Sequence, residues 1–163
     1  MSVDDIGAES GLGGGSSLYR YFSGKEALLV ALLDESLDRY LMALPSPTDD
    51  PMADIRLVAT THVAITMEAP DLGGLFVREL RSLSSENARR IERRSGVYLG
   101  AWVSFLRRAY PDTPASELEA AASTAMTTAA ALILLPHPRV NTDHEALVAD
   151  MIVASLSALE RAR

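Results

Sequence analysis

SLYRYFSGKEALL, residues 17–29, joins a short predicted helix to a much longer one. Within it, Ser23 is followed three residues later by Glu26, a pattern typical of the capping box that begins a helix. Apolar residues then recur at intervals of three and four, which predicts an amphipathic helix over residues 23–44. The apolar stripe of this helix consists of Leu29, Leu33, Leu37, Tyr40, Leu41 and Leu44.

Two short helices are predicted before the long one. A cap followed by acidic residues favours a helix over residues 2–10, which Gly11 ends. The glycines at positions 13–15 form a turn, after which a serine caps a second short helix that ends at Tyr21. Two short helices around a glycine turn, followed by a long helix, are the layout of a helix-turn-helix unit. The side chains expected to pack these helices together are Ile6, Leu18, Tyr21, Phe22 and Leu28.

This layout carries a specific residue pattern at two places. The sequence IGAESGL at residues 6–12 and the segment 17–29 together resemble the DNA-binding signature of the tetracycline-repressor (TetR) family. The resemblance implies an all-α protein, with a helix-turn-helix region and connecting helix over residues 1–44 and a helical effector-binding and dimerisation domain over residues 45–163. It also implies a ligand-responsive transcriptional regulator, a repressor that a small molecule releases from a palindromic DNA operator.

One departure from the family concerns the start of the chain. The family places another helix before the one predicted at residues 2–10, and this sequence begins without it. We expect either a start upstream of Met1 or a protein in which this first helix is missing. The alternative hypothesis is therefore a helical, dimeric ligand-binding or interaction module that does not bind DNA.

The resemblance assigns the DNA contacts to the second short helix and the start of the long one. Hydroxyl groups and free backbone N–H groups at a helix start can bind phosphate oxygens or base edges, and an arginine can bind guanine or phosphate. The net charge is −7, yet no acidic residue lies between Glu9 and Glu26. The alternative for each cation is an ordinary solvated side chain. The predicted DNA-binding residues are Ser16, Ser17, Tyr19, Arg20 and Lys25, the last matching a phosphate-contacting lysine of the family.

Prolines divide the rest of the chain into further helices. Breaks are expected at residues 45–51, at Pro70, at 111–114 and at 136–138. No segment alternates as a strand would, so the prediction is all-α. The core stripe of the longest helix is expected to be Ile91, Tyr98, Trp102, Phe105 and Leu106. The predicted helices span residues 52–68, 72–82, 84–110 and 115–135, with a last one from after residue 142 to the C-terminus.

The last two predicted helices are apolar on more than one face. A helix of this kind must be covered on several sides. In so short a chain, we expect the same two helices of a second subunit to supply the cover, as a four-helix homodimer interface. The alternative is that both helices are central in the monomer. The last helix has Leu147, Met151 and Ala154 on one face and Val148, Ile152 and Leu159 on another.

A small-molecule pocket is expected within the second domain, because ligand sites combine apolar walls with a few polar groups. The effector is expected to be apolar or acyl-type. The alternative for each pocket residue is plain core. The predicted lining is His62, Thr66, Phe76, Tyr98, Trp102, Phe105 and Met126.

A basic helical surface is interleaved with Glu79, Glu86 and Glu92. One hypothesis is that it helps to admit an anionic effector such as an acyl-coenzyme A. The alternative is a solvated face with ion pairs inside the helix. Its arginines are Arg78, Arg81, Arg89, Arg90, Arg93 and Arg94.

Other classes of protein find little support in the sequence. The chain has no cysteine, which excludes disulfides and thiolate chemistry. No histidine pair or glycine-rich motif points to an enzyme, a metal site or a cofactor. The start of the sequence has no signal-peptide pattern, and its longest apolar run is too short to span a bilayer. We expect a cytoplasmic protein that does not enter the membrane.

Overall fold

The computed structural model describes residues 21–69, 79–133 and 144–161 of the 163-residue chain. This part is helical and contains no strand, which confirms the all-α prediction. Within it, the main predicted helices are found within two residues of their expected ends. The elements are α3 (Lys25–Met42), α4 (Pro51–Glu68), the 3-10 helix η1 (Leu80–Ser82), α6 (Ser85–Ala109), α7 (Ala115–Ile133), α8 (Glu145–Leu156) and α9 (Ala158–Arg161).

Two predicted helices differ from the structure. The helix expected over residues 72–82 is described only from residue 79, where its end is the 3-10 helix η1. The helix expected to run to the C-terminus breaks at Ser157, which separates α8 from α9. The carbonyls of Val153 and Ser155 both accept from the Ser157 N–H, so the helix tightens and ends there.

The capping box predicted at the start of α3 is wrong. The residue before the helix is Gly24 rather than Ser23, and no side chain caps it. The Glu26 carboxylate instead accepts from the Ser84 N–H at 2.7 Å and from the Asn87 side-chain nitrogen at 2.9 Å, at the start of α6. These hydrogen bonds lower the Glu26 pKa to about 2. Glu26 therefore joins the beginnings of two helices, because the first N–H groups of α6 lack partners within their own helix.

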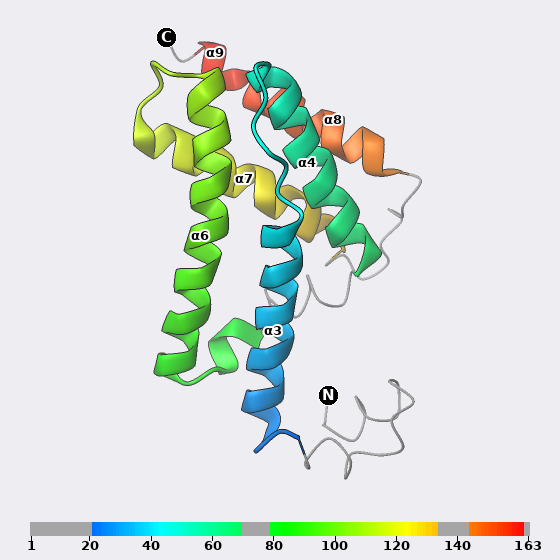
Figure 1. Ribbon diagram of the computed structural model, residues 1–163, viewed down its shortest axis with the longest axis vertical. Helices are drawn as coiled ribbons and strands as arrows, with labels where there is room; N and C mark the ends of the chain where they lie inside the picture. The colour runs from blue at the N-terminus through cyan, green and yellow to red at the C-terminus, as the bar shows by residue number, and fades with distance from the viewer. Residues whose placement is uncertain (1–20, 70–78, 134–143, 162–163) are drawn as a thin grey trace.

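α3 lies beside the first half of α6, and both helices run in the same direction (Figure 1). α4 returns along α3 and α6, while α7 crosses behind them. The inner face of α3 packs on Ile91 of α6, where the first three residues of the predicted apolar stripe, Leu29, Leu33 and Leu37, are buried. The other three, Tyr40, Leu41 and Leu44, are half-buried against the larger core. A larger core joins α4, α6, α7 and α8, and includes all the predicted α6 residues from Tyr98 onward. None of the described helices is long and apolar enough to cross a membrane.

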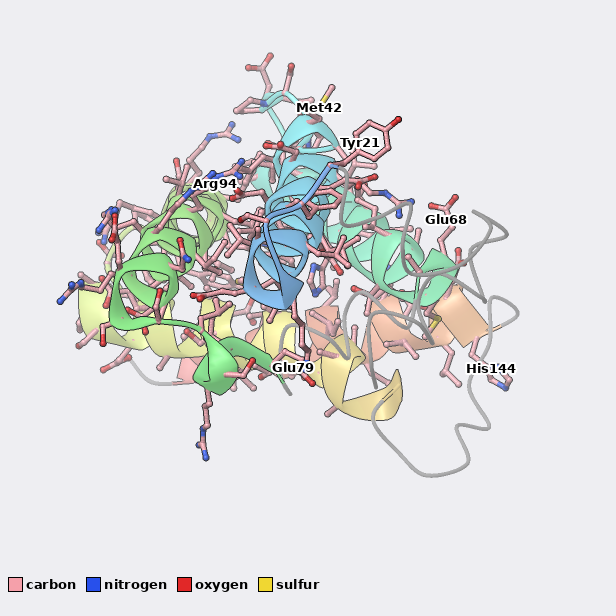
Figure 2. All side chains as sticks on the ribbon, turned by 90° about the horizontal axis from the view of Figure 1, so that it is seen from below. Tyr21, Met42, Glu68, Glu79, Arg94 and His144 are labelled. Atoms are coloured by element: carbon pink, nitrogen blue, oxygen red, sulfur yellow. The ribbon has the colours of Figure 1, made fainter. Side chains whose placement is uncertain are left out.

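Ion pairs close the contact between α3 and α6. Arg94, labelled on α6 in Figure 2, pairs with both Asp34 and Asp38 of α3. Arg90 also pairs with Asp34. The expectation of ion pairs inside the arginine-rich helix is therefore wrong for these two residues, because the acids on the neighbouring helix come closer. Arg81, Arg89 and Arg93 are exposed, and Arg78 lies outside the described residues.

The segment between α3 and α4 is anchored by a buried carboxylate. Asp54 is only 2% exposed and accepts from both the N–H and the hydroxyl of Thr48. Arg108, near the end of α6, also donates to this carboxylate. Asp50 caps α4 by accepting from two of its first N–H groups. The carboxylate of Asp54 thus joins the linker, α4 and α6.

We expect Asp54→Asn to lower the melting temperature by about 5–10 °C, because the Thr48 N–H and Arg108 lose a charged acceptor inside the protein. Thermal unfolding followed by circular dichroism measures the change. The matched control is Asp150→Asn, which removes the exposed ion pair with Arg56 and should lower the melting temperature by less than about 3 °C. Equal losses in the two variants would contradict an anchoring role for Asp54.

Candidate functional site

A cavity of about 220 Å³ lies among four helices. α3, α4, α6 and α7 all contribute to its walls. Its walls are mostly apolar, with hydroxyl groups and one imidazole among them. The described lining residues are Ser36, Leu37, Tyr40, His62, Thr66, Ser95, Tyr98, Met126, Thr127 and Ala130.

His62 is held between α6 and α7 by both ring nitrogens. Nε2 lies 3.0 Å from the carbonyl oxygen of Met126, which can only accept, so Nε2 carries the hydrogen. Nδ1 is then an acceptor and receives the hydroxyl hydrogen of Tyr98 at 3.1 Å. Burial lowers the His62 pKa to about 4. The imidazole is therefore neutral near pH 7, in one tautomer and one orientation.

Tyr40 reaches the same cluster from α3. Thr66 donates its only hydroxyl hydrogen to the carbonyl oxygen of His62 at 2.8 Å. The 2.8 Å bond between the Tyr40 and Thr66 hydroxyls must then have Tyr40 as its donor. Burial raises the pKa of both Tyr40 and Tyr98, so neither phenol ionises near neutral pH. The rings pack at centroid distances of 5.1 Å for Tyr40 and His62 and 5.3 Å for Tyr40 and Tyr98.

The structure brings together four of the residues expected to line a pocket: His62, Thr66, Tyr98 and Met126. Trp102 and Phe105 do not line the cavity, and they lie in the apolar core. The Trp102 ring meets His62 edge to face at 5.7 Å, so it stands behind the cavity wall. Phe76 lies outside the described residues.

Sequence reasoning missed the contribution of α3 to the cavity. Leu37 and Tyr40 were recognised only as members of a packing stripe, and Ser36 was not singled out. The sequence did contain a signal for Ser36, because this residue is polar and lies on the same helical face as Leu33 and Leu37. In the structure it is 4% exposed. Ser95, Thr127 and Ala130 carry no comparable signal, since only the placement of α6 and α7 around the cavity brings them there.

The end of α3 nearest the N-terminus carries the described part of the expected DNA-binding region. Lys25 is the first residue of α3, its side chain is 55% exposed, and its Nζ lies 3.8 Å from Glu79. Tyr21 was expected in the core but is 79% exposed, because it precedes the helix and its ring points away from the body (Figure 2). Phe22 packs on Leu28, as expected. The other predicted contacts, Ser16, Ser17, Tyr19 and Arg20, lie outside the described residues.

α8 has one buried and one exposed apolar face. Val148 and Ile152 are buried in the main core, as is Leu159 of α9. Leu147 and Met151 are each 58% exposed on the opposite face. Of the two faces predicted from the sequence, the monomer covers only one.

Comparison with known proteins gives matches among solved structures. No family model matches the sequence, and no curated protein matches it. A TetR family transcriptional regulator, PfmR from Thermus thermophilus, matches with a TM-score of 0.77 and 19% identity over 96% of this chain and 87% of that one. A tetR family regulatory protein from Rhodococcus RHA1 matches with a TM-score of 0.78 and 19% identity over 98% and 86%.

A third structure, a transcriptional regulator of the TetR/AcrR family from Thermobifida fusca YX-ER1, matches with a TM-score of 0.63 and 24% identity. The match covers 100% of this chain and 87% of that chain. The similarity extends over nearly the whole sequence in all three cases. The chain therefore has the fold of these regulators.

We expect the stability of the protein to fall as the pH is lowered from 6.5 towards 4. The pKa of His62 is about 4 in the folded protein and 6.5 for an ordinary histidine, so the unfolded chain binds an additional proton in this window. The loss should be on the order of 3 kcal/mol. It is measured as the free energy of urea unfolding at each pH.

His62→Gln should flatten this pH dependence, because glutamine does not titrate. His144→Gln, which removes a histidine outside the cavity, is the matched control and should keep the slope of the natural protein. Tyr40 and Tyr98, the titratable groups facing His62, stay neutral throughout the window. An unchanged slope in His62→Gln would show that another group causes the acid sensitivity.

Proposed function

We propose that this protein is a dimeric, DNA-binding transcriptional regulator of the TetR type, whose operator affinity is controlled by a small molecule in the cavity among α3, α4, α6 and α7. The observation that carries the proposal is the likeness of fold, over nearly the whole chain, to solved TetR-family regulators. The TetR-like motif at residues 17–29 supports it independently, because its described residues, 21–29, lie directly before and at the start of α3.

α3 is the physical connection between the two proposed sites. Its first residue, Lys25, belongs to the proposed DNA-binding end, while Ser36 and Tyr40 further along belong to the cavity wall. Two DNA-binding units on a symmetric operator must lie about 35 Å apart. A ligand that prefers a different placement of α3 would change this separation and release the DNA, to the extent that its affinity differs between the two states.

The exposed apolar face of α8 supports the proposed dimer. Leu147, Met151 and Ala154 follow one another at helical spacing and are all exposed. α7 packs on α8 and presents small exposed residues such as Ala120 and Ser123. A symmetric pairing of these helices would bury the apolar face of each α8 against the other subunit. Repression, rather than activation, follows from the same TetR resemblance.

DNA binding is tested with the full gene product and palindromic DNA from upstream of its own gene. We expect affinity to fall steeply with added salt, since phosphate contacts release counterions. Lys25→Ala should weaken binding and reduce the slope of log affinity against log salt by about 1. Fluorescence anisotropy of labelled DNA measures both quantities.

Arg107→Ala is the matched control, because it removes one exposed positive charge near the far end of α6. It should leave both the affinity and the salt slope unchanged. A full gene product that binds none of its upstream DNA at low salt would leave the alternative function, a helical ligand-binding or interaction module.

The dimer is tested by placing a charge on the exposed face of α8. Met151→Glu should give a monomer, because a carboxylate in the centre of the proposed interface would lose its hydration. Sedimentation equilibrium measures the mass. Val97→Glu makes the same kind of change at an exposed apolar residue of α6, 61% exposed, and should leave the dimer intact. A natural protein that sediments as a monomer would contradict the proposed interface directly.

A further inference from the structure

The hydroxyl group of Ser36 makes no hydrogen bond among the described residues. The residue is 4% exposed and lines the cavity from the middle of α3. Its oxygen is not fully enclosed, unlike the unpaired Trp102 Nε1 and Tyr110 hydroxyl, so it is open to a molecule in the cavity. Ser36 therefore marks a place where the cavity is ready to bond with an occupant.

The other polar hydrogens on the described lining side chains are already used. Both phenols and Thr66 donate within the His62 cluster, and His62 donates to Met126. Ser95 donates to the carbonyl of Ile91, and Thr127 donates to carbonyls of its own helix. Ser36 is thus the one uncommitted donor on the described walls.

The cavity offers nothing to balance an ionic charge. Its described lining contains no acidic or basic side chain apart from His62, which is neutral near pH 7. Of the charged groups close to Ser36 in α3, Glu35 is exposed, Asp34 and Asp38 are paired with Arg94, and Arg39 is paired with Glu68. An ionic group held against these described walls would lose hydration without gaining a counter-charge from them, and this disfavours its binding there.

The volume limits the size of the occupant. An apolar cavity of about 150 Å³ holds one benzene molecule, and pockets for drug-sized ligands begin near 300 Å³. The cavity here is about 220 Å³, between these values. The part of a ligand that the described walls surround therefore has on the order of ten non-hydrogen atoms. A complete acyl-coenzyme A is far larger than this volume, and it is highly charged.

We propose that the cavity binds a small uncharged molecule with an apolar ring or chain and one oxygen that accepts a hydrogen bond from Ser36. The inference adds the chemical class of the ligand to the proposed function. Binding of this ligand does not depend on that function, and only its effect on DNA affinity rests on it. Ser36 lies in the same turn of α3 as Asp34 and Asp38, the two residues that Arg94 holds against α6. It is on the other flank of the helix, because residues two apart in a helix do not share a face. A ligand bonded to Ser36 therefore acts on α3 at the point where this helix is attached to the body.

The experiment uses four probes: benzyl alcohol, toluene, benzoate and an acyl-coenzyme A. The chain has a single tryptophan, and the ring of Trp102 contacts His62 at the cavity wall, so its fluorescence reports occupancy. Calorimetry gives the affinities on the full protein without DNA. We expect benzyl alcohol to bind at least tenfold more tightly than benzoate, and the acyl-coenzyme A to leave the fluorescence unchanged.

Ser36→Ala should weaken benzyl alcohol about fivefold to tenfold and leave toluene unchanged, since only the alcohol bonds to the hydroxyl. Ser95→Ala is the matched control, because its hydroxyl lines the same cavity but is committed to Ile91. It should bind benzyl alcohol normally. Melting temperatures show that the variants are folded. Tighter binding of benzoate or acyl-coenzyme A, equal losses for toluene and the alcohol in Ser36→Ala, or no binding by benzyl alcohol would each overturn the inference.

The failure of this inference can be distinguished from the failure of the proposed function. Ser36-dependent binding of benzyl alcohol, without any effect on DNA affinity, would support the inference and contradict the proposed control of DNA binding. Salt-sensitive DNA binding by a protein that takes up none of the neutral probes would overturn the inference alone.

Discussion

The inner face of α3 packs on α6 along one part of its length and lines the cavity along another. The rest of the structure depends on this double role. Near its start the helix packs tightly on α6, where Leu33 is completely buried. Further along, the same face turns to a cavity at Ser36 and Tyr40. The apolar contact with α6 supplies the free energy of attachment, while the ion pairs of Asp34 and Asp38 with Arg94 select its position.

The polar groups around the cavity are kept in a single arrangement by a chain of hydrogen bonds. His62 donates to the carbonyl of Met126 and accepts from Tyr98. Tyr40 donates to Thr66, and Thr66 donates to the carbonyl of His62. A buried network of this kind is stable only when every member has a partner. The network therefore fixes the walls and leaves Ser36 as the variable element, which is why a ligand bond there can act on α3 rather than on the whole core.

The arginine-rich part of α6 illustrates how tertiary contacts change the meaning of a charge pattern. In the sequence these arginines alternate with glutamates, which suggests pairing within one helix. In the structure, Arg90 and Arg94 pair with acids on α3 instead, while Arg89 and Arg93 remain exposed. The arginine-rich surface, which the sequence suggested could bind an anion, is in part the surface that holds α3 against α6.

The sequence by itself determined the positions of the main helices and most of the buried stripes of α3 and α6, because helical periodicity and proline breaks are local properties of the chain. It also predicted that His62, Thr66, Tyr98 and Met126 line a small-molecule pocket. Only the tertiary structure decided that Glu26 bonds to α6 instead of capping its own helix, that Trp102 stands behind the cavity wall, and that Ser36 faces the cavity. These outcomes depend on which side chain of another helix comes within a few ångströms, a distance that spacing along one chain does not define.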